Sequence, residues 1–324
     1  MTSRSGPTFF SYPADALAQS AETAAVITGL TSETPSVSPK YLYGPLGSRL
    51  FDAITELPEY YPTRTERDLL KACRDSVARE TGPAPTLIDL GAGNCEKARS
   101  LFQALKPGQY VAVDISIDFL RQALIQLQRE FPQLEMLGIG ADFSSGLRLP
   151  DAVRRDNRLF FYPGSSIGNF TPEQALAFLA GIRTQCAGAY GGGLLIGVDL
   201  VKSETLLQAA YDDALGVTAA FNLNLLNNLN ALIGSDFAVG DWRHHALFNT
   251  GASRIEMHLE ARRDTTVHWR GGARAFHQGQ RIHTENSYKY ALPDFKALLA
   301  QAGFSRIQAW TDANNWFALC HAAL

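Results

Sequence analysis

Short apolar runs alternate with longer amphipathic segments between residues 62 and 200. Buried strands are expected at residues 86–90, 110–114, 134–139, 158–162 and 194–200, with helices between them. Strand–helix alternation at this spacing predicts a parallel, doubly wound α/β sheet. Ligands of such sheets bind at the carboxyl ends of the strands, near the point where the strand order reverses.

Two of the expected helices carry local start signals. Thr63 and Glu66 have the spacing of a capping box, and an apolar stripe follows them at Leu69, Leu70, Cys73 and Val77. Thr171 and Gln174 have the same spacing, with proline at the first turn. We therefore expect one helix to begin near each threonine.

The α/β pattern returns at the end of the chain. A helix is expected over residues 293–302, followed by strands at 306–311 and 316–320. The polar turn at residues 312–315 predicts that these last strands form an antiparallel hairpin. A parallel sheet closed by such a hairpin resembles the class I methyltransferase fold.

The strand–helix alternation is absent over residues 201–287, where helical patterns precede β-like stretches such as residues 254–259. The expected division is a core of residues 62–200 and 288–324 and a smaller α+β substrate-binding domain of residues 1–61 and 201–287. Residues 1–40 are rich in Ser, Thr, Pro and Ala, and we expect this segment to wrap over the surface.

Composition narrows the functional class. The 324 residues carry 29 Lys and Arg against 32 Asp and Glu, so a net charge of −3 gives no reason to expect nucleic acid or a membrane as a partner. No apolar run is long enough for a secretory signal or a membrane span. The four cysteines are far apart and the histidines lack tight ligand spacing, so a metal site is not expected. We expect a cytoplasmic monomer.

A glycine turn marks the candidate cofactor site. Gly91 and Gly93 lie between an expected strand and a helix, and Asp114 ends the next strand, where a carboxylate can hold ribose hydroxyls. A dinucleotide would require glycine at position 96, which is Glu96. S-adenosylmethionine has no phosphate and tolerates this glutamate. Asp142 and Phe143 suit an adenine ring, although a turn role for Asp142 is an alternative.

Five blocks of sequence resemble one known family. They are Leu57–Arg64, Leu90–Lys97, Gly164–Phe170, Asp199–Lys202 and Thr284–Tyr290, and similar blocks recur from about residue 41 to the C-terminus. Together they resemble the histidine-specific Nα-methyltransferases of ergothioneine biosynthesis, which depend on S-adenosylmethionine. The resemblance implies three methyl transfers to the α-amino group of L-histidine, giving hercynine.

The resemblance also implies the site residues. The cofactor positions that it implies are Tyr60, Gly91, Lys97, Asp114, Asp142 and Phe143, to which the glycine turn adds Gly93. The substrate positions are Tyr43, Asn169, Tyr211, Met257, Glu285 and Ser287. Asn169 and Tyr211 would hold the amino-acid head, and Tyr43 and Asn169 are the catalytic candidates. One departure from the family pattern is Gly44-Pro45 directly after Tyr43, where an aspartate is common.

Glu285 and Ser287 alternate along an expected strand, so their side chains face the same way. A carboxylate and a hydroxyl can contact both nitrogens of a neutral imidazole, which has one donor and one acceptor. The same two residues could also be ordinary polar residues of an exposed strand. Three other functions stay open: methylation of tryptophan or tyrosine, a catalytically silent nucleotide-binding protein, and an NAD-linked dehydrogenase.

Overall fold

The computed structural model describes residues 6–11, 16–144, 146–186 and 192–324, and the chain divides into two compact units. Unit 1 comprises Met1–Tyr12, Pro62–Val201 and Lys289–Leu324, and unit 2 comprises Pro13–Tyr61 and Lys202–Tyr288. The expected second domain includes residues 1–5 and 12–15, and the expected core includes residues 145 and 187–191; these positions lie outside the described residues.

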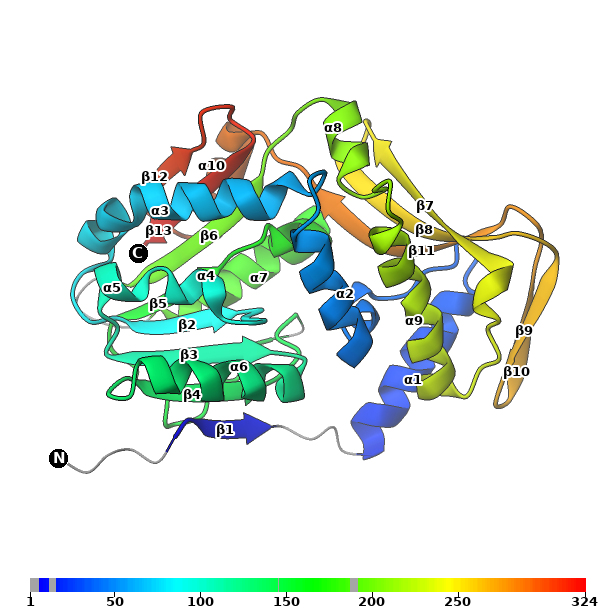
Figure 1. Cartoon of the computed structure of the whole chain (residues 1–324), viewed down its shortest axis with the longest axis horizontal. Coiled ribbons are helices and arrows are strands. Elements are labelled where there is room, and N and C mark those ends of the chain that lie inside the picture. The colour runs from blue at the N-terminus through cyan, green and yellow to red at the C-terminus, as the bar shows by residue number, and fades with distance from the viewer. Residues whose placement is uncertain (1–5, 12–15, 145, 187–191) are drawn as a thin grey trace. The chain divides into compact units, whose positions relative to one another are not determined.

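Unit 1 is built on an eight-stranded sheet with the order β1-β4-β3-β2-β5-β6-β13-β12 (Figure 1). Its strands are β1 Thr8–Ser11, β2 Thr86–Leu90, β3 Gln109–Asp114, β4 Glu135–Gly140, β5 Arg158–Tyr162, β6 Gly193–Asp199, β12 Arg306–Thr311 and β13 Phe317–Ala323. β1 to β6 pair in parallel, and β13 runs antiparallel between β6 and β12. The expected parallel sheet and the closing hairpin are thus confirmed. The order reverses between β2 and β5, which places the switch point beside the end of β2.

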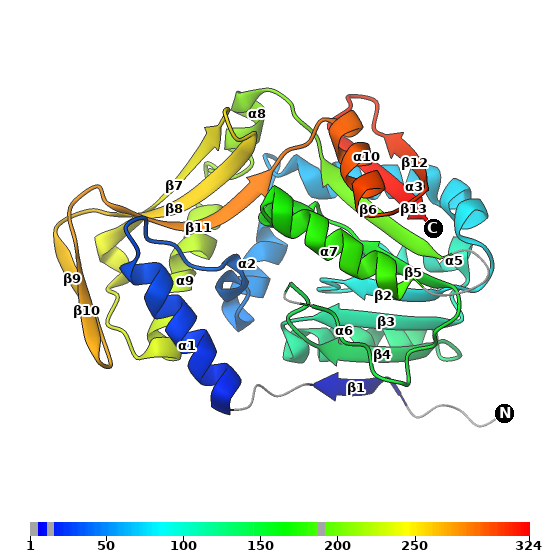
Figure 2. The ribbon, with the colours of Figure 1, turned by 180° about the vertical axis from the view of Figure 1, so that it is seen from behind.

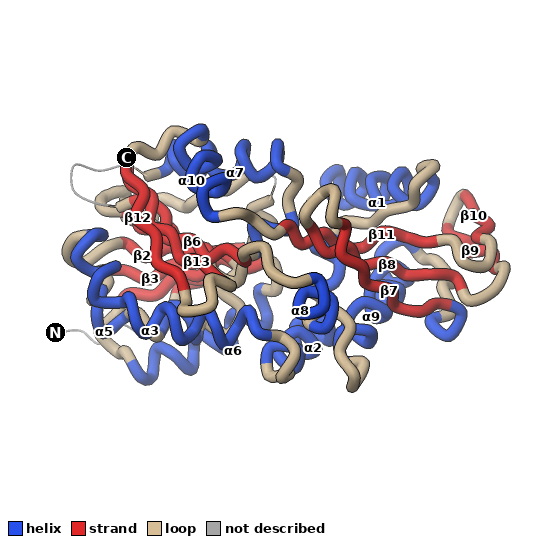
Figure 3. Tube along the Cα trace, turned by 90° about the horizontal axis from the view of Figure 1, so that it is seen from above, coloured by secondary structure: helices blue, strands red, loops and turns tan. Residues whose placement is uncertain are grey.

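Helices cover both faces of this sheet. α7 (Pro172–Gln185) and α10 (Leu292–Gln301) pack on one face, and α3 (Tyr61–Thr81), α4 (Glu96–Arg99), α5 (Phe102–Leu105) and α6 (Ile117–Glu130) pack on the other. Figure 3 shows α7 and α10 on one side of the sheet and α3, α5 and α6 on the other. Thr171 and Gln174 form the expected capping box of α7. The capping box expected at Thr63 and Glu66 is wrong, because α3 already begins at Tyr61 and Glu66 lies inside the helix.

The first strand departs from the expected division of the chain. β1 pairs in parallel with β4, with Phe9 opposite Gly138, so residues 8–11 extend the sheet of unit 1. A Cβ at Gly138 would lie 2.6 Å from the Phe9 ring, which therefore uses the space that the glycine leaves. Residues 1–40 also do more than wrap over the surface, because α1 (Ala16–Thr31) buries Val26 and Leu30.

Unit 2 combines a three-stranded antiparallel sheet, β11-β8-β7, with a two-stranded ribbon, β10-β9 (Figure 2). The strands are β7 Trp242–Asn249, β8 Arg254–Ala261, β9 Thr265–Trp269, β10 Gly272–Phe276 and β11 Arg281–Tyr288. The other elements are α1, the 3-10 helix η1 (Pro39–Leu42), α2 (Pro45–Thr55), α8 (Glu204–Ala209), α9 (Val217–Ile233) and η3 (Val239–Asp241). α9 contacts β7, β8, α1, α2 and η1 and so forms the centre of the unit.

Among the residues that the structure describes, no helix is both long and apolar enough to cross a membrane.

Candidate active site

The glycine turn of unit 1 follows β2 directly. Gly91 and Gly93 have φ of +70° and +52°, the left-handed region that glycine adopts without strain. The N–H groups of Gly91 and Ala92 both donate to the carbonyl of Val113, at 2.9 and 3.1 Å, which ties the turn to the end of β3. A Cβ at Gly93 would meet no atom within 4 Å, so the turn borders open space. The turn can therefore admit a ligand close to its backbone.

Asp114 ends β3 beside this turn. Its carboxylate accepts the N–H of Gly93 at 2.9 Å and the N–H of Ser116 at 2.8 Å. Burial raises the pKa of Asp114, and the backbone donors of Ser116, Gly93 and Ile115 act in the opposite direction. Each carboxylate oxygen can accept a second hydrogen bond. Asp114 is thus oriented by the backbone and retains capacity for the hydroxyl groups of a ribose.

Asp142 and Phe143 follow β4 on the same side of unit 1. Asp142 accepts the N–H of Ser144 at 3.0 Å, so it has the turn role that the sequence left open as an alternative. A Cβ at Gly91 would lie 3.9 Å from the tip of the Phe143 ring, and that ring packs edge-on against Tyr162 with centroids 5.8 Å apart. The structure therefore brings the loops after β2, β3 and β4 together.

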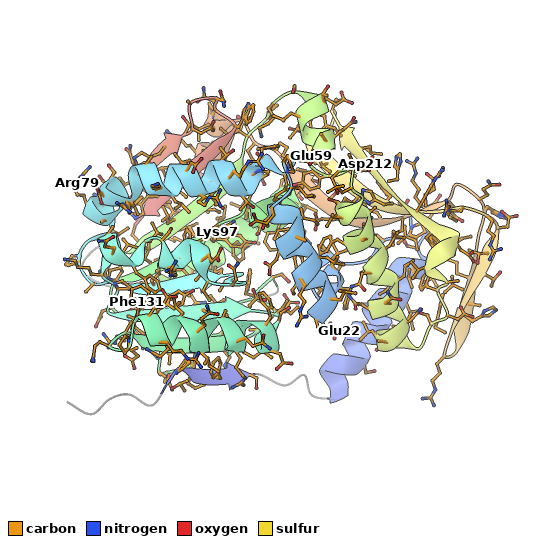
Figure 4. The ribbon with its side chains drawn as sticks, in the orientation of Figure 1. Glu22, Glu59, Arg79, Lys97, Phe131 and Asp212 are labelled. Carbon is orange, nitrogen blue, oxygen red and sulfur yellow. The ribbon has the colours of Figure 1, made fainter. Side chains whose placement is uncertain are left out.

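Lys97 contacts a residue that sequence reasoning misassigned. Its Nζ donates to Glu66 Oε2 at 2.6 Å, and both oxygens of Glu66 accept the N–H of Gly164, at 2.8 and 2.9 Å. Figure 4 shows Lys97 at the layer between α3 and α4. Glu66 could have been found from its position, because it lies four and seven residues before Leu70 and Cys73 and so on the apolar face of α3. A charged residue on a buried face is the informative signal.

The loop after β5 carries Asn169. Gly164 and Ser165 have φ of +80° and +57°, and the 3-10 helix η2 (Ser166–Asn169) follows them. Ser165 Oγ accepts the N–H of Asp199 at 2.8 Å, which anchors the loop to the end of β6. Asn169 ends η2 and is half-buried. Of the six predicted substrate residues, it alone belongs to unit 1.

Unit 2 brings together the residues predicted to read an imidazole. Tyr211 and Ser287 share a hydrogen bond of 2.7 Å between their hydroxyl groups, and Met257 lies opposite Glu285 in the pairing of β8 with β11. All four side chains are buried. Glu285 and Ser287 are therefore not polar residues of an exposed strand.

A register shift in β11 places Glu285 on the buried side. The pairing with β8 is interrupted between His283 and Glu285, which marks a β-bulge. Ile282 before the shift, Thr284 within it, and Glu285 and Ser287 after it are all buried. A bulge adds one residue and so re-aims the side chains that follow it. The alternation of Glu285 and Ser287 was predictable, but the shift that buries them was not.

Aromatic rings connect the remaining predicted residues of unit 2. Tyr43 packs edge-on against Phe51 and Phe221, with centroids 5.6 and 5.5 Å apart. Tyr60 packs against Phe51 at 6.1 Å and against Tyr211 at 6.2 Å. Phe51 and Phe221 had no sequence signal beyond ordinary core periodicity. They join Tyr43, Tyr60 and Tyr211 into one cluster of rings.

The structure explains why Gly44 and Pro45 follow Tyr43. Gly44 is the N-cap residue of α2, and Pro45 takes its first turn, where proline is favoured. A Cβ at Gly44 would lie 3.0 Å from the side-chain amide of Asn228, which donates to the carbonyl of Tyr41 at 2.7 Å. The close packing of Asn228 of α9 against this segment therefore favours a glycine next to Tyr43.

The arrangement defines a class of protein. A parallel sheet closed by an antiparallel hairpin, with a glycine turn after β2 and a carboxylate at the end of β3, is the architecture of a class I S-adenosylmethionine-dependent methyltransferase. The family model described as "Histidine-specific methyltransferase, SAM-dependent" matches residues 22–324, and the chain belongs to this family. It is an N-methyltransferase whose cofactor is S-adenosylmethionine, so a dehydrogenase function is not favoured.

Curated relatives cover nearly the whole chain. The histidine N-alpha-methyltransferase of Mycobacterium tuberculosis is 40% identical over 92% of this chain and 93% of its own length. Ergothioneine biosynthesis protein 1 of Neurospora crassa is 31% identical over 85% of this chain, which corresponds to 32% of that protein. The 4-dimethylallyltryptophan N-methyltransferase easF of Claviceps purpurea is 27% identical over 89% of this chain and 90% of its own length.

Proposed function

We propose that this enzyme transfers methyl groups from S-adenosylmethionine to the α-amino group of L-histidine, three times in succession, to give hercynine. The observation that carries the proposal is the buried pair of Glu285 and Ser287 on one side of β11, with the hydroxyl of Tyr211 bonded to Ser287 at 2.7 Å. Family membership and the 40% identical histidine N-alpha-methyltransferase support it.

The residues of unit 1 fit the cofactor. Open space beside Gly93 admits a ligand, and Asp114 has acceptor capacity for ribose hydroxyls. We assign the ring of Phe143 to the face of the adenine and Asp142 to its amino group. Gly91 and Lys97 are assigned to the amino-acid end of the cofactor. The sequence resemblance also assigns Tyr60 to the cofactor set.

We assign recognition of the imidazole to unit 2. Glu285 would accept the ring N–H, and the hydroxyl hydrogen of Ser287 would be directed to the other ring nitrogen when Tyr211 donates to Ser287 Oγ. A phenyl ring would offer neither group a hydrogen bond, and each hydrogen bond that histidine makes to them and a phenyl ring does not is worth about 0.5–3 kcal/mol. Met257 would pack against the ring. This pattern favours histidine over apolar amino acids.

S-adenosylmethionine, when bound, supplies an electrophilic methyl group on a sulfonium, and a neutral thioether is the leaving group. The protein needs to align an uncharged amine with that methyl, which is mainly a matter of proximity and orientation. We assign Asn169 and Tyr211 to the amino-acid head and Tyr43 to the amine itself. In each transfer the N–C bond forms as the S–C bond breaks, and the first two ammonium products lose a proton to water before the next transfer.

The decisive test is a substrate panel. The purified protein is incubated with labelled S-adenosylmethionine and each of the twenty amino acids, and the products are read by mass spectrometry. We expect histidine alone to gain three labelled methyl groups. Methylation confined to another amino acid, or none at all, would reject the proposal. Tryptophan is the informative competitor: its indole N–H could reach Glu285, but it offers no acceptor to Ser287.

We also propose that the monomer is the active form. Light scattering of the protein at the concentration used in the activity assay tests this. An active species found only as a dimer would contradict it.

A further inference from the structure

Glu66 is a fully buried acid that contacts one of the proposed cofactor residues, Lys97. It lies on α3 in unit 1, its side chain has no exposed surface, and it is bonded to elements far away in the sequence. The N–H of Gly164 donates to both of its oxygens, and Lys97 Nζ approaches Oε2 to 2.6 Å. One carboxylate thus connects α3, α4 and the loop after β5.

The neighbouring strand leaves room for this carboxylate. A Cβ at Gly197 of β6 would lie only 2.0 Å from Glu66 Oε1, so any larger residue there would displace the acid. Gly164 lies beside the cation of the pair, because a Cβ at this position would lie 3.2 Å from Lys97 Nζ. Two glycines, Gly197 in β6 and Gly164 in the loop after β5, therefore flank a single ion pair.

Burying a carboxylate costs desolvation free energy unless hydrogen-bond donors or a cation surround it. Glu66 has both kinds of partner, in the N–H of Gly164 and the ammonium of Lys97. The two side chains of this ion pair differ in exposure: that of Lys97 is 30% exposed, whereas that of Glu66 is fully buried. Glu66 thus binds the ammonium group of a lysine whose side chain is partly exposed. It also fixes the backbone N–H of Gly164, five residues before Asn169.

We propose that Glu66 is a positioning residue for the cofactor site: it sets the place of the Lys97 ammonium and of the Gly164 backbone. The inference rests on the proposed function only in that Lys97 is taken to face the cofactor. Glu66 itself does not touch the reacting atoms. It acts through Lys97, and its loss weakens cofactor binding more than histidine binding.

The test uses Glu66→Gln, which keeps an oxygen acceptor for Gly164 but removes the charge opposite Lys97. Glu130→Gln is the matched control, because Glu130 forms a more exposed ion pair with Arg99 of the same helix α4, at 2.8 Å. Calorimetry with S-adenosylhomocysteine gives the cofactor affinity, and steady-state kinetics give the KM of each substrate.

We expect Glu66→Gln to weaken S-adenosylhomocysteine binding about tenfold, the loss typical of one charge-assisted contact. The KM for S-adenosylmethionine should rise in parallel, and the KM for histidine should change less than about twofold. Glu130→Gln should leave all three unchanged. Equal effects on both substrates, or none on cofactor affinity, would overturn the assignment.

A double-mutant cycle separates positioning from simple stabilisation of the fold. In a Lys97→Met background, Glu66→Gln should cause almost no further loss of S-adenosylhomocysteine affinity, because the group through which Glu66 acts is gone. An undiminished further loss would show that Glu66 acts through the fold alone. If Glu66→Gln does not fold, Glu66→Asp keeps the charge at a shorter reach and should show a smaller loss of the same kind; unchanged affinity there would also overturn the proposal.

These outcomes are distinguishable from failure of the proposed function. Binding of S-adenosylhomocysteine is measured without any amino acid. If the wild-type protein did not methylate histidine, the effect of Glu66 on cofactor affinity would still be measured and would still decide the inference.

Discussion

Removing the Glu285 carboxylate should separate histidine recognition from cofactor binding. Glu285 is only 7% exposed, so water cannot readily replace it when it is truncated. A hydrogen bond to a charged group contributes about 1.5–3 kcal/mol. Glu285→Ala should therefore raise the KM for histidine about ten- to hundredfold. Glu285→Gln should have a smaller effect, because its amide oxygen still accepts the ring N–H.

The assay is initial rate against histidine concentration at saturating S-adenosylmethionine, with S-adenosylhomocysteine affinity measured in parallel. Glu256→Gln on the paired strand β8 is the control, since Glu256 forms an ion pair with Arg254 at 2.7 Å and alternates with the buried Met257. Apolar amino acids should compete better in Glu285→Ala than in the wild type. An unchanged histidine KM, or an equal loss of cofactor affinity, would refute the assignment of Glu285 to the ring.

Three further predictions concern other parts of the molecule. Tyr43→Phe should slow methyl transfer and release more mono- and dimethylated product, which mass spectrometry of early time points detects; an unchanged product distribution would contradict the role of the hydroxyl. Asp114→Asn should weaken S-adenosylhomocysteine binding about tenfold through lost ribose contacts, measured by calorimetry, and equal affinity would count against it. Burial lowers the pKa of His258 to about 4. Below pH 6.5 the unfolded chain takes up this proton and the folded protein does not, so stability should fall as the pH is lowered from 6.5 towards 4; urea unfolding should show a shallower fall in His258→Gln, and identical slopes would exclude His258 as a cause.

Long apolar runs made the central sheet predictable. The expected strands at residues 86–90 and 158–162 match β2 and β5 at both ends, because both strands are buried over their whole length. β1 could not be found in this way. It has four residues at the edge of the sheet, and its pairing depends on the space at Gly138, about 130 residues later.

The same limit explains the errors within the candidate site. Glu66 matched a local capping pattern, and only its contacts with Gly164 and Lys97 reveal what it binds. The register shift after His283 depends on pairing with β8, which no pattern within β11 encodes. The types of the site residues could be predicted from the chemistry that they perform. Their positions could not be predicted where they depend on contacts with residues far away in the sequence.

A comparison of two ion pairs suggests how a structural pair differs from a functional one. Asp199 and Lys289 lie 2.8 Å apart in unit 1, and both side chains are covered, at 1% and 0% exposure. Because neither side chain reaches the surface, this ion pair links the end of β6 to the residue that follows β11. In the pair of Glu66 and Lys97 the side chain of the acid is equally buried, but that of the lysine is 30% exposed. A lysine that is bound by a buried acid but is itself partly exposed can act on a ligand, which supports the role in cofactor binding that we propose for Lys97.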